Sequence, residues 1–224
     1  MARVDDYREA LRLATERLKG ENLHRRAKSA GAAIKMEKDG TMVISLPYLG
    51  TLHHVIVGDG VDIVREGSDP DVKLPDKVLI GHYLLNAGGK PASGEKITFR
   101  QIPDGHFYFD AFQRRARDPF LKMFGDNPEL FRRAAALLGG KPIEHGDVGI
   151  AFSVLPRVAL QIVLWIGDEE FPPEASVLFD DNIIDYLPIE DIAYISGSLV
   201  YTLMGTAARL QAQENSGGTA TDKE

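Results

Sequence analysis

The chain has 224 residues, of which 44% are hydrophobic and 26% charged, and it contains 22 glycines, 12 prolines and no cysteine. This composition is typical of a folded globular chain and excludes a disordered protein, a disulfide scaffold and any site built on thiolates. The 26 basic and 33 acidic side chains give a formal net charge of −7, which disfavours nucleic-acid binding because phosphate recognition needs a basic surplus.

The charge is unevenly distributed along the sequence. Residues 141–200 contain eleven acidic and two basic side chains, a net charge of −9, whereas residues 1–140 have a net charge of +3. The N-terminal sequence has no apolar signal segment, so we expect a cytoplasmic protein. The apolar stretch 192–210 contains too many polar residues for a membrane span, and we expect a buried helix there.

The first two predicted elements are a helix and a hairpin. Apolar side chains at helical spacing from Tyr7 to Leu18 predict an amphipathic helix. From residue 32 the apolar period changes to two, on either side of Lys38-Asp39-Gly40. A two-residue turn there would place the two apolar sets on opposite faces. A three-residue loop with Gly40 in the left-handed conformation pairs Met36 with Met42 and Ile34 with Ile44, and we prefer this register because one face can then be buried.

Further strands and helices follow this hairpin. The run from Ala159 to Ile166 is apolar on both faces except at Gln161, which is typical of a central strand. We expect Asp118-Pro119 to split a helical segment into two pieces. The remaining expected elements are a strand at 52–57, helices at 76–87, 107–124 and 127–138, a short strand at 96–101, a hairpin of strands 148–155 and 158–166, and a last helix opened by Pro188.

These elements predict an α+β fold, with an antiparallel sheet made of an N-terminal meander and a C-terminal hairpin and packed with several helices. We expect a single domain over residues 1–212. The polar residues 213–224 are rich in Gly, Ser and Thr and predict a disordered tail.

Two stretches carry a family resemblance, LPRVALQIVLWIGDEEFPPEASVLFDDNIIDYL and the earlier FRQIPDGHFYFDAFQRR. They resemble domain of unknown function 3786, an uncharacterised family from anaerobic bacteria and archaea, and the likeness runs from about Tyr7 to Leu203. Some members look like fusions to a four-cysteine iron–sulfur module, which a chain without cysteine cannot provide. The resemblance implies the cytoplasm of an anaerobe and a one-carbon or redox context. It supplies no catalytic residues.

An acidic block follows the predicted central strand. Its carboxylates could bind a hard cation such as Mg²⁺ or Ca²⁺, or raise one another's pKa for acid–base chemistry. Their spacing does not match a calcium-binding loop, which favours a solvated turn over a metal site. The candidate metal ligands are Asp168, Glu169, Glu170 and Asp180.

Aromatic, basic and acidic side chains are concentrated in the segments 107–117 and 165–180, and we predict a ligand pocket between them. An arginine could hold a phosphate or carboxylate, and the single tryptophan could form a wall for a planar ligand. Ion pairing within the chain and core packing are the structural alternatives for these side chains. The candidate ligand-binding residues are His106, Tyr108, Arg114, Trp165 and Phe171.

Three functions are consistent with the sequence, which contains no nucleotide-binding loop, zinc-protease motif or hydrolase nucleophile motif. The first is a ligand- or cofactor-binding accessory protein in anaerobic one-carbon or redox metabolism. The second is a metal-assisted hydrolase or transferase that uses the acidic block. The third is an interaction subunit without a small-molecule ligand, whose basic middle docks on an acidic partner or on its own C-terminal third; the expected assemblies are a homodimer or a complex with a redox-protein partner. The sequence identifies no cofactor, leaves catalysis open, and predicts neither nucleic-acid nor membrane partners.

Overall fold

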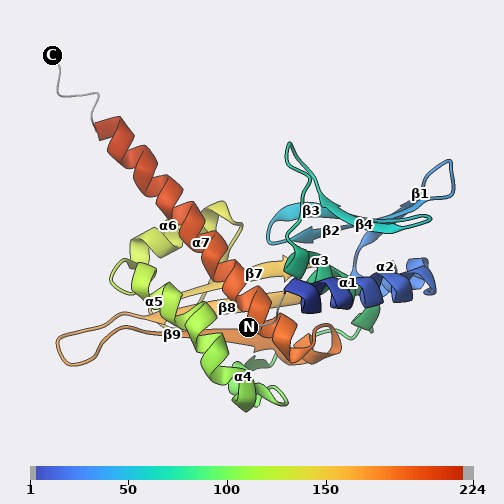
Figure 1. The fold of residues 1–224 in the computed structure, drawn as a ribbon. Helices are drawn as coiled ribbons and strands as arrows, with labels where there is room; N and C mark the ends of the chain where they lie inside the picture. The colour runs from blue at the N-terminus through green and yellow to red at the C-terminus, as the bar shows by residue number, and fades with distance from the viewer. Residues whose placement is uncertain (1–3, 219–224) are drawn as a thin grey trace. The chain divides into compact units, whose positions relative to one another are not determined.

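The structure is a computed structural model that describes residues 4–218, with the side chains of residues 4–215. Helices and two antiparallel sheets occur in one chain, so the predicted α+β class is confirmed (Figure 1). The chain divides into two compact units, each made of three segments. Among the described residues, unit 1 comprises residues 4–95, Ser153–Ala159 and Asp180–Asp191, and unit 2 comprises Lys96–Phe152, Leu160–Phe179 and residues 192–218.

The backbone passes between the two units five times, within strands β7, β8 and β9, within helix α7 and before strand β5. A single domain over residues 1–212 stays a prediction. The tail expected over residues 213–224 begins inside helix α7 (Ile189–Gly218), so residues 213–218 are helical. Residues 219–224 lie outside the described part of the chain.

Unit 1 contains a four-stranded antiparallel sheet in the order β1-β2-β3-β4. Met36 pairs with Met42 and Ile34 with Ile44, which confirms the predicted register, and Gly40 has the positive φ of 88° that the loop requires. Strand β4 was not predicted, because its five residues are too few for the alternation of apolar side chains to indicate a strand. The elements of unit 1 are α1 (Val4–Lys19), α2 (Leu23–Ala30), β1 (Ala33–Met36), β2 (Met42–Tyr48), β3 (Thr51–Val57), β4 (Val61–Arg65), α3 (Leu74–Asn86) and the 3₁₀ turn η3 (Asp181–Asp185).

One face of this sheet supplies the core of unit 1. Ile44, Leu46, Val55 and Ile63 share that face and are at most 1% exposed. Burial of a side chain of this size contributes about 1.5–3 kcal/mol relative to an exposed one. Helices α1 and α3 pack against each other along their length.

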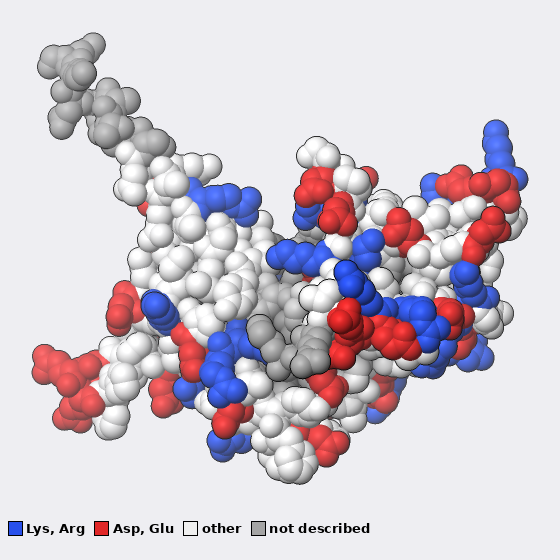
Figure 2. All heavy atoms as spheres, in the orientation of Figure 1, with Lys and Arg blue, Asp and Glu red and all other residues white. Residues whose placement is uncertain are grey.

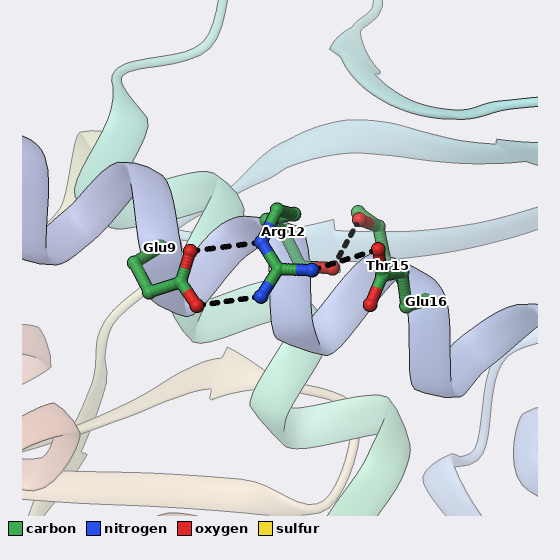
Figure 3. A network of polar contacts seen from close by, with 4 residues as sticks. All are labelled: Glu9, Arg12, Thr15 and Glu16. Carbon is green, nitrogen blue, oxygen red and sulfur yellow. Dashed lines mark hydrogen bonds and ion pairs between the residues drawn. The ribbon is translucent and has the colours of Figure 1, made fainter.

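Helix α1 also carries an exposed polar network (Figure 3). The Arg12 guanidinium donates to Glu9 at 2.6 and 2.8 Å and to Glu16 at 2.8 Å, and the Thr15 hydroxyl donates to the Arg12 carbonyl oxygen at 2.9 Å. Exposed pairs at this spacing stabilise a helix by only about 0.2–0.5 kcal/mol each. The network therefore supports the helix and does not mark a site.

Partly buried polar contacts connect distant segments of unit 1. The Lys90 carbonyl oxygen accepts hydrogen bonds from the Asn182 amide at 2.9 Å and from the Tyr186 hydroxyl at 2.6 Å. His82 Nδ1 lies 2.7 Å from the Asp191 carboxylate, which joins α3 to the first turn of α7. These contacts hold η3 and the start of α7 within unit 1.

Unit 2 contains most of a five-stranded antiparallel sheet in the order β5-β9-β8-β7-β6. Strand β8 is central, and it forms a hairpin with β7, as predicted. This hairpin and the N-terminal meander belong to different sheets. The strands are β5 (Lys96–Thr98), β6 (Lys141–Ile143), β7 (Val148–Leu155), β8 (Val158–Trp165) and β9 (Glu174–Asp180). The helical elements are η1 (Phe99–Gln101), α4 (Gly105–Phe112), η2 (Gln113–Arg117), α5 (Asp118–Phe124), α6 (Pro128–Leu137) and α7.

Helix α7 includes the apolar stretch that we expected to be a buried helix. Ile192, Ile195, Leu199 and Leu203 are buried, and the Ser196 hydroxyl is satisfied by the Ile192 carbonyl oxygen at 2.7 Å. None of the helices described over residues 4–218 has both the length and the apolar character that crossing a membrane requires.

Candidate functional site

A cleft of about 500 Å³ opens in unit 2 between a long helical segment and strand β9. We call it the β9 cleft. Its volume falls within the range of about 300–1,000 Å³ typical of small-molecule sites. The helical wall consists of Phe109, Phe112, Gln113, Arg117 and Leu121. The strand wall consists of Glu174, Ala175, Ser176 and Val177. The ends of the cleft are lined by Thr98, Phe99, Arg100, Pro172 and Pro173.

The helical wall repeats every four residues, through Phe109, Gln113, Arg117 and Leu121. Four residues of an α-helix turn about 40° beyond a full circle, so such a series drifts around a regular helix. Here α4, η2 and α5 form one continuous helix in which η2 is a π-helical turn. This wider turn takes up part of the drift and keeps the four side chains on the cleft.

The π turn has a local cause in the sequence. Pro119 has no backbone N–H and cannot donate to the Arg115 carbonyl oxygen one turn earlier. The Asp118 N–H donates to the Gln113 carbonyl oxygen, five residues back, which is the π-helical pattern. The helix was expected to split at Asp118-Pro119. The helix continues instead, because the π turn keeps the backbone hydrogen-bonded next to Pro119, through the bond from the Asp118 N–H to the Gln113 carbonyl oxygen.

A close approach of the backbone places Arg100 beside the helical wall. Asp104 has a positive φ of 62°, and a side-chain carbon at Gly105 would lie only 2.1 Å from the Phe99 carbonyl oxygen. Glycine at position 105 therefore lets α4 start directly against η1. As a result, the Arg100 guanidinium carbon lies 4.0 Å from the centre of the Phe109 ring, a cation–π contact.

Stacked phenylalanines form the base of the helical wall. The rings of Phe99 and Phe112 are parallel, with centroids 4.2 Å apart, and each lies 6.2 Å from the ring of Phe179 on β9. All three side chains are at most 5% exposed. They fix η1 and α4 against the strand and make the cleft a preformed cavity.

The charged groups at the cleft are two guanidinium groups and one carboxylate. Arg117 is paired with its neighbour Asp118 at 3.1 Å, and both side chains remain more than 40% exposed. Arg100 is exposed above Phe109, and Glu174 is exposed at the start of β9. The cleft therefore has two guanidinium groups, which can bind carboxylate or phosphate in bidentate fashion, and that of Arg117 already contacts Asp118 through Nε and Nη2.

The segments predicted to enclose a pocket both line the β9 cleft, but the five candidate ligand residues do not. His106 is exposed in the first turn of α4, Tyr108 is half-buried, and Arg114 points to solvent from the π turn. Trp165 is 36% exposed at the end of β8, with its ring 5.9 Å from His145. Phe171 is 67% exposed in the loop between β8 and β9.

That loop carries three of the four predicted metal ligands. Asp168, Glu169 and Glu170 are exposed and, with Phe171, line a shallow depression of about 430 Å³. Acidic residues gather at its tip (Figure 2). The Asp168 carboxylate accepts the backbone N–H groups of Glu170 and Phe171, both at 2.8 Å, which lowers the pKa of Asp168. It acts as the cap of a tight turn.

The fourth predicted metal ligand is separated from this loop. Asp180 is buried at the opposite end of the seven-residue strand β9, about 20 Å along an extended chain. Among the described residues, no three His, Asp or Glu side chains lie close enough together to hold a metal ion. The structure thus does not bring the four carboxylates into one site.

Six polar residues of the cleft were not candidates in the sequence, namely Thr98, Arg100, Gln113, Arg117, Glu174 and Ser176. The four-residue series from Phe109 to Leu121 was a usable signal for two of them. The position of Arg100 had no such signal, since it depends on the turn at Asp104-Gly105 and on the pairing of β5 with β9, which is distant in sequence.

Comparison with protein families matches residues 22–202 to a family described as Domain of unknown function (DUF3786). This range includes every residue that lines the β9 cleft. Comparison with curated proteins and with solved structures gives no match.

Proposed function

We propose that this chain, which belongs to the DUF3786 family, binds a ligand in the β9 cleft of unit 2. The ligand combines an anionic group with an apolar portion. The protein acts as a binding accessory rather than a catalyst. A cytoplasmic role in anaerobic one-carbon or redox metabolism is part of the proposal and is supported by the family resemblance in the sequence.

The observation that carries the proposal is the position of Arg100 over the ring of Phe109, on the same cleft as Arg117. A guanidinium group held on an aromatic face keeps its fork of donors available while losing little side-chain entropy on binding. The buried stack of Phe99 and Phe112 holds this arrangement in place before a ligand arrives. Anion recognition and an apolar wall are thus combined in one preformed cavity.

A fluorescence titration with anilinonaphthalene sulfonate, a planar apolar anion, tests the proposal. We expect saturable binding to the full-length protein, weakened at least fivefold by Arg100→Gln. Arg114→Gln is the matched control, because Arg114 is exposed and does not line the cleft, and it should change the affinity less than twofold. Equal weakening by both variants, or no saturable binding, would overturn the proposal.

The other two functions stay predictions. A metal-assisted hydrolase or transferase would need Asp168, Glu169, Glu170 and Asp180 to act together. An interaction subunit, as a homodimer or with a redox-protein partner, would need a surface that binds another protein.

A further inference from the structure

The strand wall of the β9 cleft is an open edge of the sheet. Strand β5 is the neighbour of β9 on this side and has three residues, whereas β9 has seven. At its start β5 lies beside the end of β9, since the Asp181 N–H donates to the Glu95 carbonyl oxygen at 3.3 Å. In an antiparallel pair, β5 therefore leaves the first part of β9, Glu174–Val177, without a strand on its outer side among the described residues.

The sequence itself stops β5 at this point. The Thr98 N–H and hydroxyl both donate to the Gln101 side chain, at 2.8 and 2.9 Å, and this capping box turns the chain into η1. The cleft is lined by Thr98, Phe99 and Arg100 at one end and by Glu174–Val177 along its side. The cavity thus occupies the place that a longer β5 would fill.

Open strand edges carry unpaired backbone groups that can bind another strand. Alternate residues of β9 direct both their N–H and C=O groups outward, so two of the four residues in Glu174–Val177 present these groups to the cleft. An extended peptide that enters here gains main-chain hydrogen bonds from the edge and side-chain contacts from the opposite wall.

The opposite wall indicates which peptide fits. Arg100 and Arg117 favour acidic side chains, whereas Phe109, Leu121 and Pro172 favour apolar ones. Side chains alternate between the two faces of a strand, so a sequence of alternating acidic and apolar residues presents both kinds. Glu174 disfavours an acidic residue beside its own end of the cleft.

We propose that the β9 cleft binds an extended acidic segment of a partner protein, which adds to β9 as a strand in line with β5. This inference rests on the proposed function, because it names the ligand class of the same cleft. The main-chain edge of Glu174–Val177 provides hydrogen bonds and orientation, and the two arginines select acidic over basic segments.

Calorimetric titration of the full-length protein with acetyl-Val-Glu-Val-Glu-Val-amide tests this proposal. Alternate amides of a strand point to opposite edges, so N-methylation of only the valines and N-methylation of only the glutamates block different edges. One of these two peptides should bind at least tenfold more weakly and the other within threefold of the parent. A peptide with lysine in place of glutamate should also bind at least tenfold more weakly.

Variants of the protein complete the test. Arg117→Gln should weaken binding of the acidic peptide about fivefold, whereas Arg114→Gln should leave its affinity within twofold.

If both methylated peptides bind like the parent, or both lose binding equally, strand addition is overturned. If anilinonaphthalene sulfonate binds as proposed but the peptide does not, strand addition is wrong and the ligand-binding function stands. If neither probe binds, the proposed function fails as well.

Discussion

The two units use their polar side chains in different ways. In unit 1, partly buried polar groups are paired within the fold, as with His82 and Asp191 or with Tyr186 and the Lys90 carbonyl oxygen. In unit 2 the polar groups of Arg100, Gln113 and Arg117 lie on the wall of a cleft. The comparison indicates that substitutions of these paired groups in unit 1 should affect stability, whereas those on the cleft should affect binding.

Gly105→Ala should have the largest effect on stability. Its new methyl group would lie 2.1 Å from the Phe99 carbonyl oxygen, so α4 must move away from η1. Overpacking of this kind costs about 1–3 kcal/mol, and we expect the upper end because the obstacle is backbone. Urea unfolding measures the loss.

Gly205→Ala is the matched control for this variant, also in unit 2. Nothing lies within 4 Å of a side-chain carbon at this position of α7, and alanine favours a helix over glycine. We expect it to stabilise the protein by about 0.5–1 kcal/mol. A similar loss in both variants would contradict the close approach of α4 to η1.

His82→Ala should have the next largest effect on stability, and it tests the polar pairing in unit 1. The substitution leaves the Asp191 carboxylate, whose side chain is 13% exposed, without its 2.7 Å partner. Loss of a hydrogen bond to a charged group costs about 1.5–3 kcal/mol. His24→Ala, at an exposed position of α2, should change the free energy of unfolding by less than about 0.5 kcal/mol. Binding of anilinonaphthalene sulfonate should be unchanged in both variants.

Two histidines of unit 1 should make stability depend on pH, in opposite directions and by less than the substitutions above. The hydrogen bond to Asp191 raises the pKa of His82. The stabilisation of the folded state by this pair is therefore complete below the unfolded-state pKa of His82 and is lost as pH rises through its folded-state pKa. Burial lowers the pKa of His53, so stability is lost as pH falls below the unfolded-state value near 6.5. Urea unfolding between pH 5 and 9 should show that the free energy of unfolding falls less with rising pH in His82→Ala than in the parent protein. An unchanged profile would contradict the pair.

Arg117→Gln should have the smallest effect on stability. Its pair with Asp118 is exposed, and such pairs contribute about 0–1 kcal/mol. Binding of anilinonaphthalene sulfonate should nevertheless weaken about fivefold. A variant that loses stability in proportion to binding would show that Arg117 is structural and would remove the difference between the two units.

The sequence predicted the local parts of this fold well. The first hairpin register followed from burying Ile34 and Ile44 on one face, and the β7–β8 hairpin and the buried part of α7 followed from their apolar patterns. The pairing of β5 with β9 could not be predicted, because it joins segments about 80 residues apart and neither strand has a pattern that selects the other.

The candidate site was predictable as two segments but not as residues. Composition indicated the regions around Phe107–Arg117 and Trp165–Asp180, and both contribute to the cleft. Which side of the helix faces β9 depends on the π turn caused by Pro119. This turn places Arg117 on the cleft and leaves Arg114 exposed. The four-residue series from Phe109 to Leu121 is consistent with this arrangement, but the spacing of a regular helix alone does not select this face.

The most direct test of the central claim is an amide chemical-shift map of the full-length protein titrated with anilinonaphthalene sulfonate. We predict that the largest shifts fall on Phe109–Leu121 and Glu174–Val177, with small shifts along α1–α3. Largest shifts in the acidic loop Asp168–Phe171, or in unit 1, would contradict the assignment of the β9 cleft as the binding site.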